Sequence, residues 1–101
     1  MTSPEPYEIR LGKVAARAFE RLPQELRQWI RKALLDLARR VSEGGRIGGK
    51  RSKSIRGSAD TFHRLRVGDH RVMYDVLHDE RVVLVLGIVD RNDLDRWLRD
   101  R

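Results

Sequence analysis

One run of eight residues, Val82–Val89, constrains the fold of this 101-residue chain more than any other segment. It reads Val-Val-Leu-Val-Leu-Gly-Ile-Val, so a strand formed by it is apolar on both faces. Such a strand belongs in the interior of a sheet, because it needs neighbouring strands on both edges and packed elements above and below it. We therefore expect a sheet that is covered on both faces for much of the length of this strand.

The first part of the chain predicts one strand and two helices. Residues 7–11 alternate between apolar and polar side chains, which favours a short strand. Apolar residues then recur at helical spacing over 14–22 and over 26–41, with Trp29 in the apolar stripe of the second helix. Pro23 separates the two helices. Together they predict a helical hairpin that packs against the sheet.

Residues 61–77 read as a β-hairpin with an arginine-rich face. Two alternating runs flank a Gly-Asp connection at 68–69, whose composition favours a primed two-residue turn. That turn places Arg66 directly across from Arg71, and Arg64 shares their face because side chains two apart on a strand point the same way. Like charges opposite each other destabilise a sheet. We therefore expect this face to bind an anion that offsets the repulsion.

A last short helix is predicted over 93–99, with acidic residues in its first turn and Arg99 in its last. The predicted fold class is α+β: a four-stranded, mainly antiparallel sheet with an N-terminal helical hairpin packed on it, in the order β-α-α-β-β-β-α. We expect a single domain over 1–101, in which residues 1–6 are disordered and the glycine-rich stretch 43–60 is a basic loop.

The positive charge of the chain is concentrated near the predicted hairpin. The formal net charge is +7, and the segment from Arg46 to Arg71 contains eight Lys or Arg residues against two Asp residues. We interpret this concentration as a nucleic-acid-binding surface, since a basic loop beside an arginine face can close over a polyanion. A solvated surface and a disordered connector are the alternative interpretations. The basic residues of the loop that are candidate contacts are Lys50, Arg51, Lys53 and Arg56.

The composition excludes several other classes of site. The chain contains no cysteine, which rules out disulfides and thiolate zinc sites, and its three histidines are scattered, so neither a metal nor a cofactor is expected. No apolar run approaches the length of a membrane span, and residues 1–6 lack the apolar segment of a signal peptide. These features predict a cytoplasmic protein without a membrane partner.

Three motifs resemble the RelE/ParE superfamily of bacterial and archaeal toxins from toxin–antitoxin pairs. They are Lys53-Ser-Ile-Arg-Gly57, the arginine hairpin Arg64-Leu-Arg-Val-Gly-Asp-His-Arg-Val-Met-Tyr74, and Val89-Asp-Arg91 after the apolar strand. The middle motif is the specific one, and the resemblance covers nearly the whole chain. It implies a cognate antitoxin protein as partner.

The RelE branch of this superfamily cuts mRNA in the ribosomal A site, by attack of a ribose 2′-hydroxyl on its own 3′-phosphate. If the chain belongs with that branch, RNA is the expected ligand of the basic loop, and the matching catalytic positions are Arg64, Arg66, Arg71 and Arg91. Their guanidinium groups would stabilise the charge that builds on the phosphoryl oxygens. Spacing alone leaves other interpretations of Arg91, as a cap of the preceding sheet or as a partner of Asp93 or Asp95.

The resemblance does not supply a general base. Trp97 stands at the matching C-terminal position, where we expect core packing, with stacking on an RNA base as the functional alternative. His63 and His70 occupy the strand positions that alternate with those of the arginines, so both side chains are expected to point to the other face. Asp75 is better suited to orient a guanidinium than to take up a proton. A ParE-like protein that inhibits DNA gyrase by binding, and a basic nucleic-acid-binding module, therefore remain alternative functions.

Overall fold

The computed structural model describes residues 5–44 and 62–100. Most of the predicted basic loop lies outside these ranges, together with its candidate RNA contacts Lys50, Arg51, Lys53 and Arg56. The elements follow the predicted order, and a short 3-10 helix precedes the last α-helix. Their bounds are β1 Glu8–Leu11, α1 Lys13–Glu20, α2 Gln24–Ser42, β2 His63–Val67, β3 His70–Leu77, β4 Val82–Asp90, the 3-10 helix η1 Arg91–Asp93 and α3 Leu94–Arg99.

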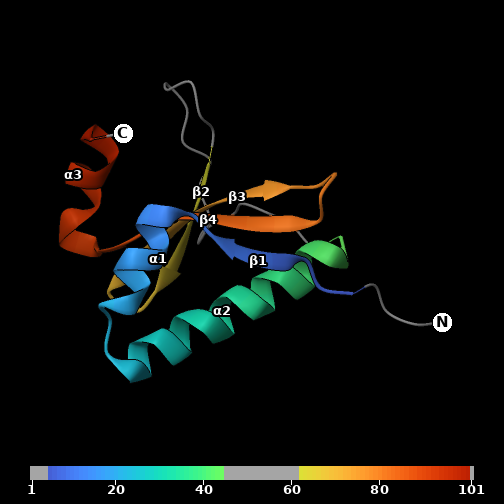
Figure 1. Ribbon diagram of the computed structural model, residues 1–101, viewed down its shortest axis with the longest axis horizontal. Helices are drawn as coiled ribbons and strands as arrows, with labels where there is room; N and C mark the ends of the chain where they lie inside the picture. The colour runs from blue at the N-terminus through green and yellow to red at the C-terminus, as the bar shows by residue number, and fades with distance from the viewer. Residues whose placement is uncertain (1–4, 45–61, 101) are drawn as a thin grey trace.

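The strands form one sheet in the order β1-β4-β3-β2 (Figure 1). The pairs β2–β3 and β3–β4 are antiparallel, whereas β1 runs parallel to β4. The prediction of a four-stranded, mainly antiparallel sheet is therefore confirmed. β4 lies between β1 and β3, as its apolar sequence required.

One face of the sheet packs against α1 and α2 and contains the larger core. Ile30 of α2 and Val72, Tyr74, Val83 and Val85 of the sheet are fully buried there. Figure 1 shows α2 running along this side of the strands. We call this the helix face.

The predicted place of Trp29 in the apolar stripe of α2 is wrong, because its side chain is 64% exposed. The buried line of the helix instead runs through Ile30, Leu34, Ala38 and Val41, at intervals of three or four residues. Trp29 is about 100° away from Ile30 around the helix axis and therefore lies outside this line. Its indole forms part of the protein surface.

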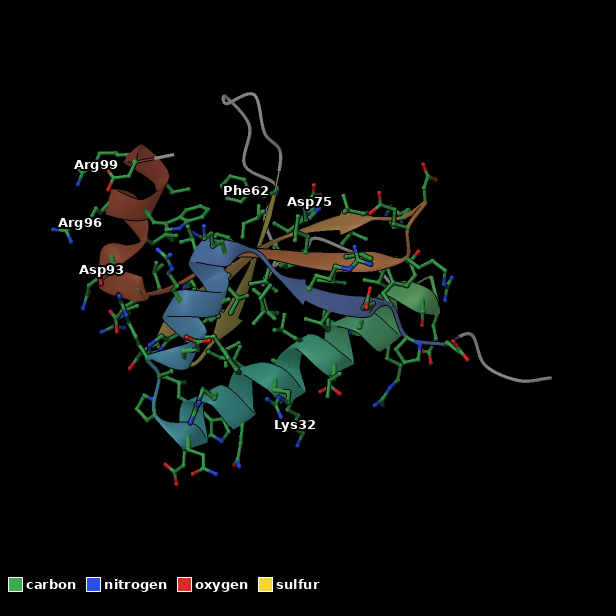
Figure 2. The ribbon with its side chains drawn as sticks, viewed as in Figure 1. Lys32, Phe62, Asp75, Asp93, Arg96 and Arg99 are labelled. Carbon is green, nitrogen blue, oxygen red and sulfur yellow. The ribbon has the colours of Figure 1, made fainter. Side chains whose placement is uncertain are left out.

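The opposite face of the sheet is partly covered by α3. Phe62, Met73 and Leu94 are buried there, with Trp97 and Leu98 packed around them, and Figure 2 shows Phe62 beside the strands on this side. This second, smaller apolar cluster confirms that β4 needs cover on both faces.

A β-bulge in β4 changes which positions of the strand face each core. Met73 pairs with Gly87 and Tyr74 with Val85, so the register between β3 and β4 skips Leu86. Beyond the bulge the alternation changes parity. As a result Val83 and Val85 before the bulge and Ile88 after it all belong to the core on the helix face, while Leu86 and Val89 contact the cluster under α3.

None of the helices within residues 5–44 and 62–100 is long and apolar enough to span a membrane.

Candidate anion-binding site

The hairpin of β2 and β3 brings two arginines into direct opposition. Arg66 pairs with Arg71 and Val67 with His70 across a two-residue turn. Gly68 has a φ of 57°, which a residue without a Cβ adopts at little cost and which the first central position of a type II′ turn requires. The local sequence thus fixes the register, and the predicted pairing of Arg66 with Arg71 is confirmed.

Four arginines converge on this face, which is the one opposite α1 and α2. Burial lowers the pKa of Arg71, as do Arg66, Arg64 and Arg91, in decreasing order of effect, while Asp69 raises it. The guanidinium of an arginine nevertheless stays charged throughout the accessible pH range. The structure therefore assembles Arg64, Arg66, Arg71 and Arg91 into one cationic surface, which we call the arginine face.

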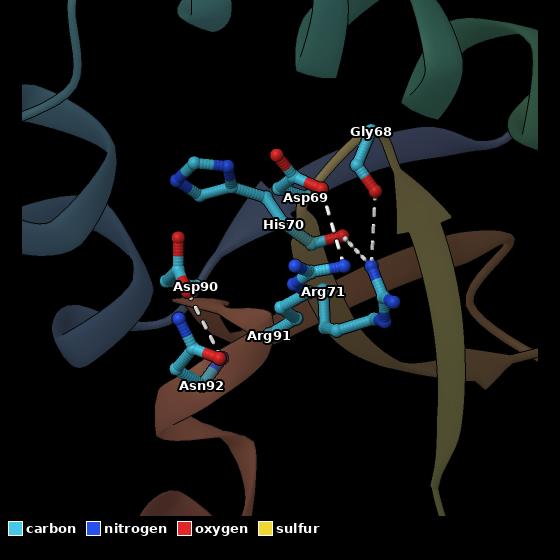
Figure 3. Close-up of polar contacts among 7 residues, drawn as sticks. All are labelled: Gly68, Asp69, His70, Arg71, Asp90, Arg91 and Asn92. Atoms are coloured by element: carbon cyan, nitrogen blue, oxygen red, sulfur yellow. Dashed lines mark hydrogen bonds and ion pairs between the residues drawn. The ribbon is translucent and has the colours of Figure 1, made fainter.

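The guanidinium of Arg71 bends back toward the turn that precedes its strand. Its Nη1 atom donates to the carbonyl oxygen of Gly68 at 3.1 Å and to that of His70 at 3.0 Å (Figure 3). Both contacts use one nitrogen of the group, and the other nitrogens can donate to a ligand. Arg71 is thus held at the centre of the arginine face with donor capacity left over.

Arg91 reaches the arginine face through the turn of the hairpin. Its backbone N–H donates to the carbonyl oxygen of Asp69 at 2.8 Å, and its Nη1 atom lies 3.8 Å from Oδ1 of the same residue (Figure 3). The alternative partners considered from spacing, Asp93 and Asp95, do not form this pair. Sequence reasoning missed Asp69, although it had identified the turn that contains it.

The side chain of Asp90 has a local structural role. Its Oδ1 atom accepts a hydrogen bond from the backbone N–H of Asn92 at 2.9 Å, which caps the 3-10 helix η1. This cap begins the turn from β4 into η1 and α3. It fixes the direction in which the chain leaves the sheet at Arg91.

Trp97 packs directly on the sheet next to the arginine face. A Cβ atom added to Gly87 would lie 2.5 Å from Nε1 of the indole, so only glycine leaves room for this contact. The ring of Trp97 also meets that of Phe62 edge to face, with centroids 5.5 Å apart. The expected packing role of Trp97 is confirmed, and its stacking on an RNA base stays a prediction.

The histidine nearest the start of β2 lies on the helix face. His63 pairs with Tyr74, and their rings are 5.3 Å apart. Burial lowers the pKa of His63, Asp75 opposes that effect, and His78 adds to it. Its Nδ1 atom is buried without a hydrogen-bond partner. His63 is therefore a packed side chain on the wrong face to act on an anion held by the arginines.

The acidic side chain of Asp75 is also engaged locally, since its Oδ1 atom accepts from the backbone N–H of Val76 at 2.8 Å. In the part of the chain that the structure describes, no group of three His, Asp or Glu side chains is arranged to hold a metal ion. The described site thus consists of guanidinium groups and the turn that orients them. Guanidinium groups are the donors that bind phosphate-like anions best and that can stabilise negative charge developing on them.

A family model described as the ParE toxin of type II toxin–antitoxin systems, parDE, matches residues 9–94. No sequence among curated proteins matches this chain with significance.

Solved structures of similar fold come from bacteria and archaea. The chain is similar to one in the toxin–antitoxin complex RelBE2 from Mycobacterium tuberculosis, with 23% identity, a TM-score of 0.68, and coverage of 86% of this chain and 100% of that one. The chain is also similar to one in the RelE–RelB complex from Pyrococcus horikoshii, with 22% identity, a TM-score of 0.65, and coverage of 86% of this chain and 97% of that one. The isolated RelE toxin of E. coli has 23% identity and a TM-score of 0.59, and the match covers 89% of this chain and 97% of that one. At these identities the likeness establishes the fold.

Proposed function

This chain belongs to the ParE toxin family of type II toxin–antitoxin systems, within the RelE/ParE superfamily, and we propose that it is an endoribonuclease that cuts ribosome-bound mRNA. The observation that carries this proposal is the convergence of Arg64, Arg66, Arg71 and Arg91 on one face of the sheet. A toxin that acted only by apolar contact would gain nothing from the repulsion among these groups. An RNA phosphate offsets that repulsion.

The reaction is attack of a ribose 2′-hydroxyl on the adjacent 3′-phosphate, which expels the 5′-oxygen of the next nucleotide. Negative charge builds on the phosphoryl oxygens and on the leaving oxygen as the bond forms and breaks. Arg71 stands centrally among the four arginines and donates in a planar fork that matches two phosphoryl oxygens. Arg64, Arg66 and Arg91 surround it and supply further positive charge, and such preorganised charge is a major source of rate enhancement.

Proton transfer is the part of the reaction that the described residues support least. His63 lies on the helix face, Asp75 accepts a backbone hydrogen bond, and Asp69 is paired with Arg91. We therefore propose that the chain contributes charge and positioning, and that the ribosome orients the 2′-hydroxyl. This division of roles agrees with a site made of arginines.

A cognate antitoxin is the proposed protein partner. Structural neighbours of this chain were solved as toxin–antitoxin complexes, among them RelBE2 and the RelE–RelB pair of Pyrococcus horikoshii. The net charge of +7 suits an acidic antitoxin segment, because complementary charge accelerates association and excludes wrong partners. The arginine face is the surface on which such a segment would block RNA.

Inhibition of DNA gyrase without bond breaking is the second candidate function. Two observations favour it: the matching family model is the ParE toxin, and Trp97 packs on Gly87 and Phe62 at a position where an acid–base residue would assist cleavage. In that case the arginine face would bind DNA phosphates or an acidic surface of gyrase.

Induction of the protein in cells separates the two functions. Messenger RNA 5′ ends and plasmid supercoiling are measured in the same culture. Codon-phased cuts in translated messages support the nuclease, whereas loss of negative supercoils with intact messages supports the gyrase inhibitor and refutes the nuclease. Arg71→Ala is the inactivating variant, and Arg40→Ala is the matched control, since Arg40 is an exposed arginine of α2 on the other side of the sheet.

A further inference from the structure

The turn between β2 and β3 already presents oxygen atoms to the arginines of the site. Arg71 donates to the carbonyl oxygens of Gly68 and His70, and Arg91 lies against the carboxylate of Asp69. Figure 3 shows these groups gathered around the turn. In the free protein, protein oxygens therefore stand next to donors that a phosphate would use.

We propose that Asp69 is an internal counterion of the arginine face, which pairs with Arg91 in the free protein and is displaced by a phosphate group of the bound RNA. Asp69 is thus a positioning residue that acts through Arg91. Its negative charge weakens the binding of polyanions in general. Only ligands that contact the whole arginine face then bind tightly. The inference rests on the proposed function to the extent that the displacing ligand is an RNA phosphate.

The geometry suits a pair that opens easily. The separation of 3.8 Å is well beyond the 2.7–2.9 Å of a charge-assisted hydrogen bond, and the two side chains are 60% and 74% exposed. An exposed pair of this length contributes little stability and is screened by salt. A phosphate that contacts several arginines at once can therefore replace the single carboxylate.

A second contact keeps Arg91 in place when the ion pair opens. The backbone N–H of Arg91 donates to the carbonyl oxygen of Asp69 at 2.8 Å, and this bond does not involve the carboxylate. Displacement of Asp69 consequently frees the guanidinium of Arg91 without moving its backbone. Asp69 also affects the centre of the site, because it offsets the influence of the other arginines on Arg71.

The first test measures binding of a fluorescently labelled single-stranded RNA oligonucleotide to the full chain. Asp69→Asn removes the charge, keeps the size of the side chain, and suits a turn. Asp79→Asn is the matched control, because Asp79 is an exposed aspartate in the turn between β3 and β4 and its replacement changes the net charge equally. We expect Asp69→Asn to bind the RNA about two- to fivefold more tightly at moderate salt, and Asp79→Asn to bind as the unmodified protein does.

The salt dependence of the same binding distinguishes a counterion from a structural role. Freeing Arg91 adds one phosphate contact, so the slope of log K against log salt concentration should steepen by up to about 0.7 in Asp69→Asn. An equal gain in both variants, or weaker binding by Asp69→Asn, would overturn the proposal.

A second measurement does not depend on RNA or on the activity. The Nε–Hε resonance of Arg91 in the free protein should shift in Asp69→Asn and stay unchanged in Asp79→Asn. If this shift occurs and the unmodified protein cuts no mRNA, the counterion stands and the proposed nuclease fails. If Arg91 does not respond while mRNA is cut, the counterion is refuted and the nuclease stands.

Discussion

The two faces of the sheet are built from the same strands and are stabilised in opposite ways. On the helix face, alternate side chains of β3 and β4 such as Val72, Tyr74 and Val83 are fully buried against α1 and α2. On the opposite face, α3 covers Phe62, Met73 and their neighbours, and beside them lie the arginines of the arginine face, whose like charges repel one another. The difference teaches that buried apolar side chains of the helix face maintain the fold, whereas repulsion among the arginines opposes folding and marks the arginine face as the candidate site.

The largest effect is expected from a cavity in the core of the helix face. Ile30 of α2 is completely buried, and Ile30→Ala removes apolar contacts and leaves a void. The free energy of unfolding should fall by about 2–5 kcal/mol. Urea denaturation followed by circular dichroism measures it. A fall of less than about 1 kcal/mol would show that the helix face does not carry the main core.

Replacement of Gly87 tests how α3 packs on the sheet next to the arginine face, because Gly87 contacts Trp97 of that helix. In Gly87→Ala the new Cβ would meet the indole at 2.5 Å, so α3 must shift or the strand must bend. We expect a loss of about 1–3 kcal/mol, smaller than in the main core.

The tryptophan emission of Trp97 in a Trp29→Phe background should shift to the red as α3 leaves the sheet. The double variant Gly87→Ala with Trp97→Leu relieves the clash and should regain part of the loss. No recovery would mean that the clash is not the cause.

Replacement of an arginine of the arginine face should affect stability and function in different ways. Arg66→Ala removes half of a like-charged pair, so the free energy of unfolding should stay constant or rise by up to about 1 kcal/mol. If the proposed function is correct, the rate of mRNA cleavage should fall by about 100-fold or more. Arg40→Ala is the control for the loss of one charge. A variant that unfolds readily would contradict the view that this face opposes folding.

The smallest effect is expected from the titration of His63 on the helix face. Burial lowers its pKa in the folded protein below the ordinary value of 6.5, so the unfolded chain takes up a proton first as the pH falls. Stability should therefore decline as the pH drops below about 6.5, and this decline should level off below the folded pKa.

The comparison with His63→Gln between pH 7.5 and pH 5.5 isolates this contribution. Asp75 and His78 influence His63 in opposite directions, and both are retained in the variant. A decline of equal size in the variant would assign the effect to other groups.

The features that were predictable from the sequence are those set by local chemistry. The pairing of Arg66 with Arg71 depends on a short turn with glycine at a position of positive φ, and the interior place of β4 depends on its apolar composition. Both signals lie within a few residues of the feature they predict. The family motifs added Arg91, which the structure places beside the other arginines.

The features that escaped prediction depend on how distant segments meet. Asp69 pairs with Arg91 because β4 happens to end next to the hairpin turn, and no local spacing encodes that meeting. The skip at Leu86 changes the parity of β4 within a uniformly apolar run, where alternation gives no signal. Trp29 looked like a core residue by type and spacing, and its exposure depends on where α2 crosses the sheet.

The parallel pairing of β1 with β4 has a consequence for the order of folding. Glu8 pairs with Val82, so most of the chain lies between the two strands, whereas β2, β3 and β4 are joined by short turns. Contacts between distant segments form slowly, and local hairpins form fast. On a ribosome, β1 must wait for β4 to be synthesised before the sheet can close. A nascent chain therefore cannot complete this sheet until β4 has left the ribosome.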